Sequence, residues 1–549
     1  MSATGRAGSV TLLPIVPIIT PLAGALLCAT VRFSETGGFT RRLAYATFVA
    51  LTAISVAVLR GFGPDATVQL PPASHVDLPA MPLWSPLAYW AASLLLGVLF
   101  VGQLADHDRP LSAVRAAHYL VVLAATMAVI SAGNSVSLVI AWSIPSWLVL
   151  YLRVAHSEGS QRVSRWDTWA GFISTALVIL GATAGSAEQE GSLFLIELAP
   201  RLAFYAFALA AGTRLLLWPL AGGRGRWWQL HAMSLVSGLF LWIRIGIALD
   251  ATGPLVRAPF LAAIVFMALG LAIGPREGQS RVVPFSFGYW LALIVLAPLL
   301  DPERGFAVSL LIGTQLLLCL VLLRGEIAPS SGPWLPRLPG LVAFAALSGL
   351  VMTSGFAAHW VFGQICFDVS GYGLLAVAAV AYLLAAVPLW RRLSSAVMSP
   401  AREPGHVGAG ASAYILAAIA GGLVLLGVWP GVLLRIWPDI RVGLESLGYR
   451  ELWGNDLGNR LGLIAATVLA PASTGLFGQR LQPAVEQFYG RVDRAGQSAR
   501  GEWLYLVAQR IAARGTGAMR AALEALEESL PLVWCLVWCI ALVYYLLQM

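Results

Sequence analysis

The chain has 549 residues, of which 58% are hydrophobic and only 11% are charged. Because soluble domains carry roughly 25% charged residues, this composition excludes a soluble protein and predicts an integral membrane protein. The formal net charge of +8 does not indicate nucleic-acid binding, since the arginines lie in short loops between apolar stretches, where such residues orient helices.

Apolar stretches long enough to cross a bilayer follow one another along most of the chain. A helical span needs about 20 apolar residues. We therefore predict an all-α polytopic protein with about sixteen transmembrane helices, near residues 11–30, 42–60, 83–102, 117–133, 135–153, 168–185, 200–220, 229–249, 257–275, 282–300, 306–324, 338–358, 370–390, 411–434, 459–477 and 530–547. The first stretch lacks a convincing cleavage site and is expected to be a span rather than a removed signal.

Basic and acidic residues alternate from loop to loop along the chain. With the N-terminus outside, arginines such as Arg41, Arg42 and Arg391 fall in inside loops, whereas Asp301 and Asp368 fall in outside loops. Cytoplasmic loops are the ones that carry an excess of arginine and lysine. The sequence therefore predicts a multi-pass protein of the cell inner (cytoplasmic) membrane, with both termini outside.

One polar segment, residues 483–528, cannot span a bilayer. It places apolar residues such as Trp503, Val507 and Ile511 at helical spacing, with arginines between them. This pattern is typical of an amphipathic helix that lies along the cytoplasmic face before the last span. A helical connector that packs on the protein's own loops fits the pattern equally well.

The cysteines do not indicate a metal or redox site. Cys535 and Cys539 share a helix face at i and i+4, but no histidine or carboxylate joins them, which favours packing. The sequence has no CxxC pair and no Gly-rich phosphate loop. We therefore expect no cofactor, no metal and no catalytic site in the chain itself.

Four stretches between residues 118 and 390 carry a resemblance to a known family. They read NSVSLVIAWSIPSWLVLYL, ALAAGTRLLLWPL, LHAMSLVSGLFLWIRI and PGLVAFAALSGLVMTSGFAAHWVFGQ. In this order they resemble the fifth, seventh, eighth and twelfth spans of the antiporter-like proton-translocating subunits of respiratory complex I and its relatives. Those relatives include membrane-bound hydrogenases, multisubunit cation/proton antiporters and bacterial inorganic-carbon accumulation complexes.

The chain departs from this family at its charged residues. The family's glutamate falls at Ser143 and the lysine of its broken seventh helix at Arg214, with Gly212 and Pro219 retained around the predicted break. A buried lysine can gain and lose a proton because desolvation lowers its pKa, and a paired glutamate modulates that pKa. A buried arginine stays protonated and a serine cannot act as a counter-charge, so this part should not pump by the family mechanism.

The later family positions lose further titratable groups. Two family lysines fall at Ser280 and Leu317, and the leucine interrupts any hydrated polar axis. The terminal lysine falls at His359, and the family histidine is kept as His231. The unperturbed pKa of a histidine side chain is about 6.5, so the two histidines could each pass a proton.

A structural role for these groups is the alternative that we favour. His231 and His359 would then be hydrogen-bonded core residues. Arg214 would be held by carbonyl groups freed at Pro219, or by a carboxylate such as Glu197.

The resemblance also implies how the chain is organised. We expect N-terminal spans at 1–115, two antiporter-like helix bundles at 116–275 and 276–400, C-terminal spans at 401–480, and the lateral helix with a final anchor span at 481–549.

Two functions follow from the resemblance and its departures. The first is a membrane subunit of a complex I-like assembly that provides a scaffold and docking, with impaired or absent proton translocation. The second is an active proton or cation transporter that uses a rewired path through His231 and His359. A transporter or enzyme of another family is the least favoured. The expected partners are the lipid bilayer, other membrane subunits and a soluble or peripheral protein, with no nucleic acid.

Overall fold

The computed structural model describes most of the first 433 residues. The described ranges are 13–30, 38–61, 84–105, 111–133, 137–146, 165–186, 201–221, 228–246, 254–273, 279–323, 334–350, 352–370, 372–398 and 411–433. The predicted spans at 459–477 and 530–547 and the lateral helix at 483–528 lie outside these ranges.

Within the described residues the chain is helical and contains no strand, which confirms the all-α class. A short 3-10 helix, η1, covers Leu13–Ile15. The α-helices are α1 Val16–Thr30, α2 Gly38–Gly61, α3 Pro86–Ala105, α4 Ala113–Ser131, α6 Arg165–Ser186, α7 Arg201–Ala221, α8 Trp228–Gly246, α9 Pro254–Ile273, α10 Gln279–Leu300, α11 Pro302–Leu322, α12 Trp334–Leu347, α13 Ser354–Ser370, α14 Tyr372–Met398 and α15 Ala411–Val428. A further short helix covers Ser137–Ser146.

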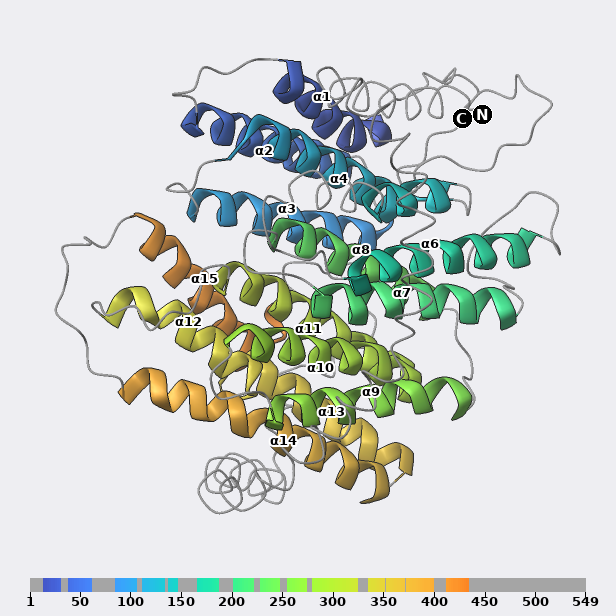
Figure 1. Cartoon of the computed structure of the whole chain (residues 1–549), viewed down its shortest axis with the longest axis vertical. Coiled ribbons are helices and arrows are strands. Elements are labelled where there is room, and N and C mark those ends of the chain that lie inside the picture. The colour runs from blue at the N-terminus through green and yellow to red at the C-terminus, as the bar shows by residue number, and fades with distance from the viewer. Residues whose placement is uncertain are drawn as a thin grey trace, which may run out of the picture.

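The helices lie side by side across the long axis of the molecule (Figure 1), with α1 and α2 towards one end and α13 and α14 towards the other. In α11 89% of the most apolar stretch is buried, against 24% in α14. On α2, the large apolar side chains of Leu43, Leu51, Ile54 and Val58 are exposed. Helix α11 therefore lies in the core, whereas α2 and α14 leave much of their apolar surface uncovered by the described residues.

Local sequence signals set where the helices begin. Asp301 caps α11 by accepting a hydrogen bond from the backbone of Arg304 at 3.1 Å, and Pro302 opens the helix. Ser112 caps α4 in the same way. Side chains of this kind satisfy backbone N–H groups that the first turn leaves without a partner, which matters most in an apolar surrounding.

Six described helices are long and apolar enough to cross a membrane by length and composition. They lie at Leu13–Thr30, Thr40–Gly61, Pro86–Ala105, Ala113–Ser131, Pro302–Leu322 and Tyr372–Trp390. Together with the composition, they make the chain a multi-pass membrane protein.

One predicted span is divided in two. The sequence predicts a single helix at 338–358, but α12 ends at Leu347 and α13 begins at Ser354. Between them Gly349 has φ +68° and Met352 has φ +66°, which turns the backbone out of the helical path. The prediction was wrong here because hydropathy alone does not register an interruption inside an apolar stretch.

Close backbone packing holds this interruption in place. A Cβ atom on Gly355 would lie 2.0 Å from the carbonyl oxygen of Ala346, so only glycine lets the two half-helices meet. A Cβ atom on Gly427 of α15 would lie 2.3 Å from the Cα of Thr353. The backbone of α15 therefore rests directly on the segment that joins α12 to α13.

Replacing Gly427 should test this contact. We expect Gly427→Ala to destabilise the detergent-solubilised protein by about 1–3 kcal/mol, because the new methyl group meets backbone that cannot move aside. Gly422→Ala is the matched control, since nothing lies within 4 Å of its Cβ position on the same helix. Tryptophan fluorescence during thermal unfolding measures both, and equal stability of the two variants would contradict the close contact.

Candidate functional site

Arg214 lies on α7 and is 2% exposed. The carbon at the centre of its guanidinium group lies 4.1 Å from the centre of the Trp142 ring. An arginine over a tryptophan face is attracted by the electron density of the ring, and this attraction grows when water is excluded. The aromatic ring thus contacts the cation directly beside Ser143 in the chain.

The Trp142 ring is itself fixed by hydrogen bonds. Its Nε1 donates to Ser174 Oγ at 3.0 Å, and this hydroxyl donates to the carbonyl of Ala210 at 3.0 Å. The short helix Ser137–Ser146 is thereby connected through α6 to α7, just before Arg214. The neighbouring Ser143 donates to the carbonyl of Ile140 at 2.8 Å within its own helix.

The remaining predicted positions in this part are placed as follows. Gly212 faces Phe260, whose ring atoms would lie 3.1 Å from a Cβ atom there. Helix α7 continues without interruption through Gly212 and ends at Ala221, two residues after Pro219. The predicted break is therefore not seen within α7, because the proline falls in its last turn, where it removes only one helical hydrogen bond. Glu197 lies outside the described residues.

His231, Ser280 and Leu317 fall on three different helices. His231 is half-buried on α8, Ser280 is the second residue of α10, and Leu317 is fully buried on α11. Helix α11 packs against both α8 and α10, so the three positions belong to one continuous group of helices.

His359, on α13, is held by two hydrogen bonds. Its Nδ1 lies 3.0 Å from the carbonyl oxygen of Gly355, and its Nε2 lies 2.9 Å from the hydroxyl of Tyr289 on α10. A carbonyl oxygen only accepts, so Nδ1 carries the proton, and Nε2 of the neutral ring accepts from Tyr289. The rings of Trp290 and Tyr382 lie 4.2 and 4.5 Å from the imidazole, between centroids.

Three neighbouring helices supply hydrogen bonds to the interruption between α12 and α13. Trp290 Nε1 donates to the carbonyl of Leu347 at 3.0 Å, and the hydroxyl of Tyr382 donates to Gly349 at 3.3 Å. Gln315 Nε2 donates to Ala346 at 3.3 Å. Ser354 in turn donates to Gln315 Oε1 at 3.0 Å. Backbone groups freed inside a membrane must be satisfied within the protein, and these side chains do so.

At this site the sequence pattern indicates His359 but not Tyr289, Trp290, Gln315 and Tyr382. These residues lie far from His359 in the chain and on different helices. One signal was available, since Gln315 is an uncharged polar residue inside the strongly apolar stretch of α11 and lies two positions from Leu317.

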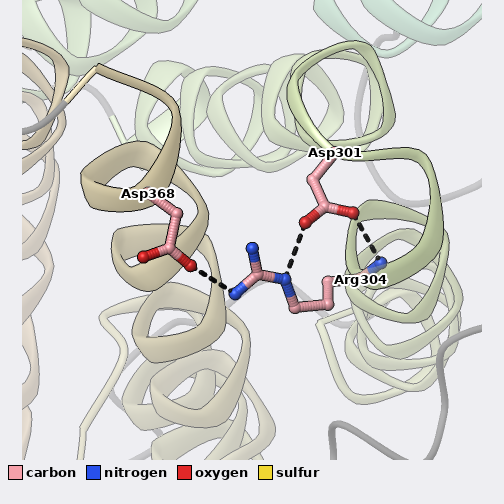
Figure 2. Close-up of polar contacts among 3 residues, drawn as sticks. All are labelled: Asp301, Arg304 and Asp368. Atoms are coloured by element: carbon pink, nitrogen blue, oxygen red, sulfur yellow. Dashed lines mark hydrogen bonds and ion pairs between the residues drawn. The ribbon is translucent and has the colours of Figure 1, made fainter.

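A cavity of about 650 Å³ lies beside His359, between α13, α14 and the start of α11. At its other end Arg304 forms ion pairs with Asp301 and Asp368, both at 2.7 Å. Figure 2 shows the guanidinium group of Arg304, on α11, directed towards the carboxylate of Asp368, on α13. Among the described residues, no group of three or more His, Cys, Asp or Glu side chains could hold a metal ion.

No family model and no curated protein matches this sequence. Solved structures do match its fold. A chain of the Mrp complex from Dietzia sp. DQ12-45-1b superposes with a TM-score of 0.68 and 16% identity, over 99% of this chain and 63% of that chain. This chain therefore covers less than two thirds of the Mrp chain, 63% of its length.

Two other membrane complexes contain chains of the same fold. One is the membrane-bound sulfane sulfur reductase, an archaeal respiratory membrane complex, with a TM-score of 0.62 and 15% identity over 97% of this chain and 99% of that chain. The other is respiratory complex I from Thermus thermophilus, with a TM-score of 0.59 and 16% identity over 77% and 98%. The chain has the fold of an antiporter-like, complex I-type subunit. At this level of identity the likeness concerns the fold.

Removing one hydrogen bond from the interruption should weaken the fold. Trp290→Phe keeps an aromatic ring beside His359 but removes the donor to Leu347, and an unsatisfied buried carbonyl costs about 1–3 kcal/mol. Trp360→Phe makes the same change at an indole N–H that has no hydrogen-bond partner among the described residues. Thermal unfolding in detergent should therefore show a larger loss for Trp290→Phe, and a smaller loss would contradict the assigned hydrogen bond.

Proposed function

We propose that the chain is a membrane subunit of a complex I-like assembly, where it provides an antiporter-like scaffold and docking surface with impaired proton translocation. The observation that carries this proposal is the arginine at position 214, buried and packed on Trp142, at the place of the family lysine. The fold shared with chains of three membrane complexes supports the assignment to a multisubunit assembly.

Chemistry at this position favours a structural role. A relay group must release its proton, and a guanidinium group keeps it even when buried. Ser143 donates to its own helix and carries no charge that could modulate a neighbour. The Trp142 ring instead offers a fixed, uncharged contact to a permanent cation.

The remaining sequence predictions complete this proposal. They comprise about sixteen spans, the five-part organisation of the chain, the cytoplasmic lateral helix, and both termini outside the cell inner membrane. The lateral helix would provide attachment for neighbouring membrane subunits, and the inside loops would face a peripheral partner.

A residual proton path through His359 is the second candidate function. It is favoured by the hydrogen bond between Nε2 of His359 and Tyr289 and by the cavity beside the imidazole. A neutral histidine with its acceptor nitrogen on a hydroxyl group can take up a proton and release it again. His231 would extend this path towards α8.

Proton flux into liposomes that contain a pH-sensitive dye separates these functions. If the chain is a scaffold, the same low proton flux is expected for the wild type, His231→Ala and His359→Ala, because none of these proteins conducts protons. For the second function, His359→Ala should lower the flux by about a hundredfold, as expected when a proton-transfer group is lost.

Restoring the family residues provides the complementary experiment. The double variant Ser143→Glu with Arg214→Lys should raise proton flux above wild type in the same liposomes, because a buried lysine beside a carboxylate can titrate. Ser143→Gln with Arg214→Lys is the matched control without the carboxylate charge. If neither double variant gains flux over wild type, these two substitutions are not what limits translocation.

Purification of the full-length chain from its native membrane tests the assembly. We expect it to elute from size exclusion together with other membrane proteins in fixed proportion, because the fold is that of subunits in multisubunit complexes. Elution of the chain alone in a mild detergent would contradict the proposal.

A further inference from the structure

The cavity beside His359 is a groove between α13 and α14. Its lining residues recur every three or four positions on each helix, so they form one stripe on α13 and a second on α14. The stripes are mostly apolar, and the small residues Gly363 and Ala378 leave room between the helices. Both residues are only half-buried, so the described residues leave the groove partly open along its length. The stripes include His359, Gly363 and Phe367 on α13 and Leu375, Ala378 and Tyr382 on α14.

The length of the groove is close to the thickness of one bilayer leaflet. His359 and Asp368 line it at positions of α13 that lie about 13 Å apart along the helix axis. The hydrocarbon core of a bilayer is about 30 Å thick, so each leaflet contributes about 15 Å. The cavity volume of about 650 Å³ is in the range of about 300–1,000 Å³ that is typical of pockets for a single ligand. A long apolar groove of this size suits one extended acyl chain better than a compact ligand.

The Asp368 end of the groove lies where three helices begin or end. Helix α13 ends at Ser370, α14 begins at Tyr372 and α11 begins at Pro302. Tyr372 is 79% exposed, and its ring packs edge-on against Phe367 with 5.4 Å between centroids. Exposed tyrosines at the ends of membrane helices are typical of the interface where lipid headgroups lie. We therefore expect this end of the groove at the level of the headgroups.

The charged groups at this end suit a zwitterionic headgroup. Arg304 contacts Asp301 through Nε and Asp368 through Nη1, both at 2.7 Å. Nη2 of Arg304 and the second oxygen of Asp368 take no part in these ion pairs (Figure 2), which leaves a donor and an acceptor of opposite charge side by side. A phosphate oxygen matches the donor and an ammonium group matches the acceptor. Two carboxylates against one guanidinium group also leave one negative charge in excess, which repels a headgroup of net negative charge.

We propose that the groove is a binding site for one phospholipid whose headgroup carries a primary amine, such as phosphatidylethanolamine. The phosphate group contacts Arg304, the ammonium group contacts Asp368, and one acyl chain lies between α13 and α14 as far as His359. A choline headgroup has no N–H group to donate and binds less tightly. Because only 24% of the most apolar stretch of α14 is buried, the acyl chain adds a contact that holds this helix against α13. The lipid site goes beyond the proposed function and does not depend on proton flux.

Photolabelling of the full-length protein locates the lipid. The protein is reconstituted in phosphatidylcholine nanodiscs that contain a trace of one phospholipid probe with a diazirine in an acyl chain and an ethanolamine, choline or glycerol headgroup. We expect the ethanolamine probe to label peptides of α13 and α14 about tenfold more than either other probe, because only its ammonium group donates a charged hydrogen bond to Asp368. An excess of unlabelled phosphatidylethanolamine should remove this label, and mass spectrometry of the peptides measures it.

Two pairs of variants test the headgroup and the chain separately. Asp368→Asn should give equal labelling by the ethanolamine and choline probes, whereas Glu303→Gln, which removes a negative charge outside the groove at the start of α11, should keep the preference. Gly363→Leu should abolish the label, because its side chain enters the groove, where a Cβ atom meets only Leu375 at 3.7 Å. Gly421→Leu on α15 is the matched control, since nothing lies within 4 Å of its Cβ position.

Equal labelling by the three probes, or a preference that survives Asp368→Asn, would indicate bulk lipid only and would overturn the site. Absence of label from α13 and α14, or label that persists in Gly363→Leu, would overturn it as well, because the groove would then hold no acyl chain. Ala378→Leu, on the opposite wall, replaces Gly363→Leu if that variant does not accumulate. Labelling requires no proton flux, so its outcome is distinct from that of the flux experiments.

Discussion

The interruption between α12 and α13 is the constraint on which this part of the structure depends. It frees carbonyl groups in the interior of a membrane protein, where no bulk water can satisfy them. Trp290, Gln315 and Tyr382 come from three surrounding helices to donate to these groups. The positions of α10, α11 and α14 around α13 are therefore coupled to the same backbone feature that positions His359.

Arg214 and His359 lie in two different kinds of environment. Arg214 is a permanent cation that lies on an aromatic ring. His359 is a neutral ring whose acceptor nitrogen meets a hydroxyl group. Both arrangements are compatible with burial, but only the second leaves a group that can change its protonation state.

Hydropathy predicted much of the described fold, because a bilayer imposes a length of about 20 apolar residues on each span. Most described helices overlap a predicted span, with boundaries that differ by a few residues. The interruption could not be predicted in this way. The side chains that stabilise it lie 31 or more residues away in the chain. Only the Ser-Gly pairs on either side, Ser348-Gly349 and Ser354-Gly355, hinted at it.

The candidate site shows the same division between local and distant information. The sequence indicates Arg214 and His359 as candidate residues, since an ionisable side chain inside an apolar stretch is a local signal. It does not show that the Trp142 ring lies against Arg214, nor that the hydroxyl group of Tyr289 meets Nε2 of His359. Those contacts depend on helix packing. What a substituted charge does in a membrane protein is therefore decided by the neighbours that packing gives it, and a loss of the original pair does not by itself leave the position without a defined role.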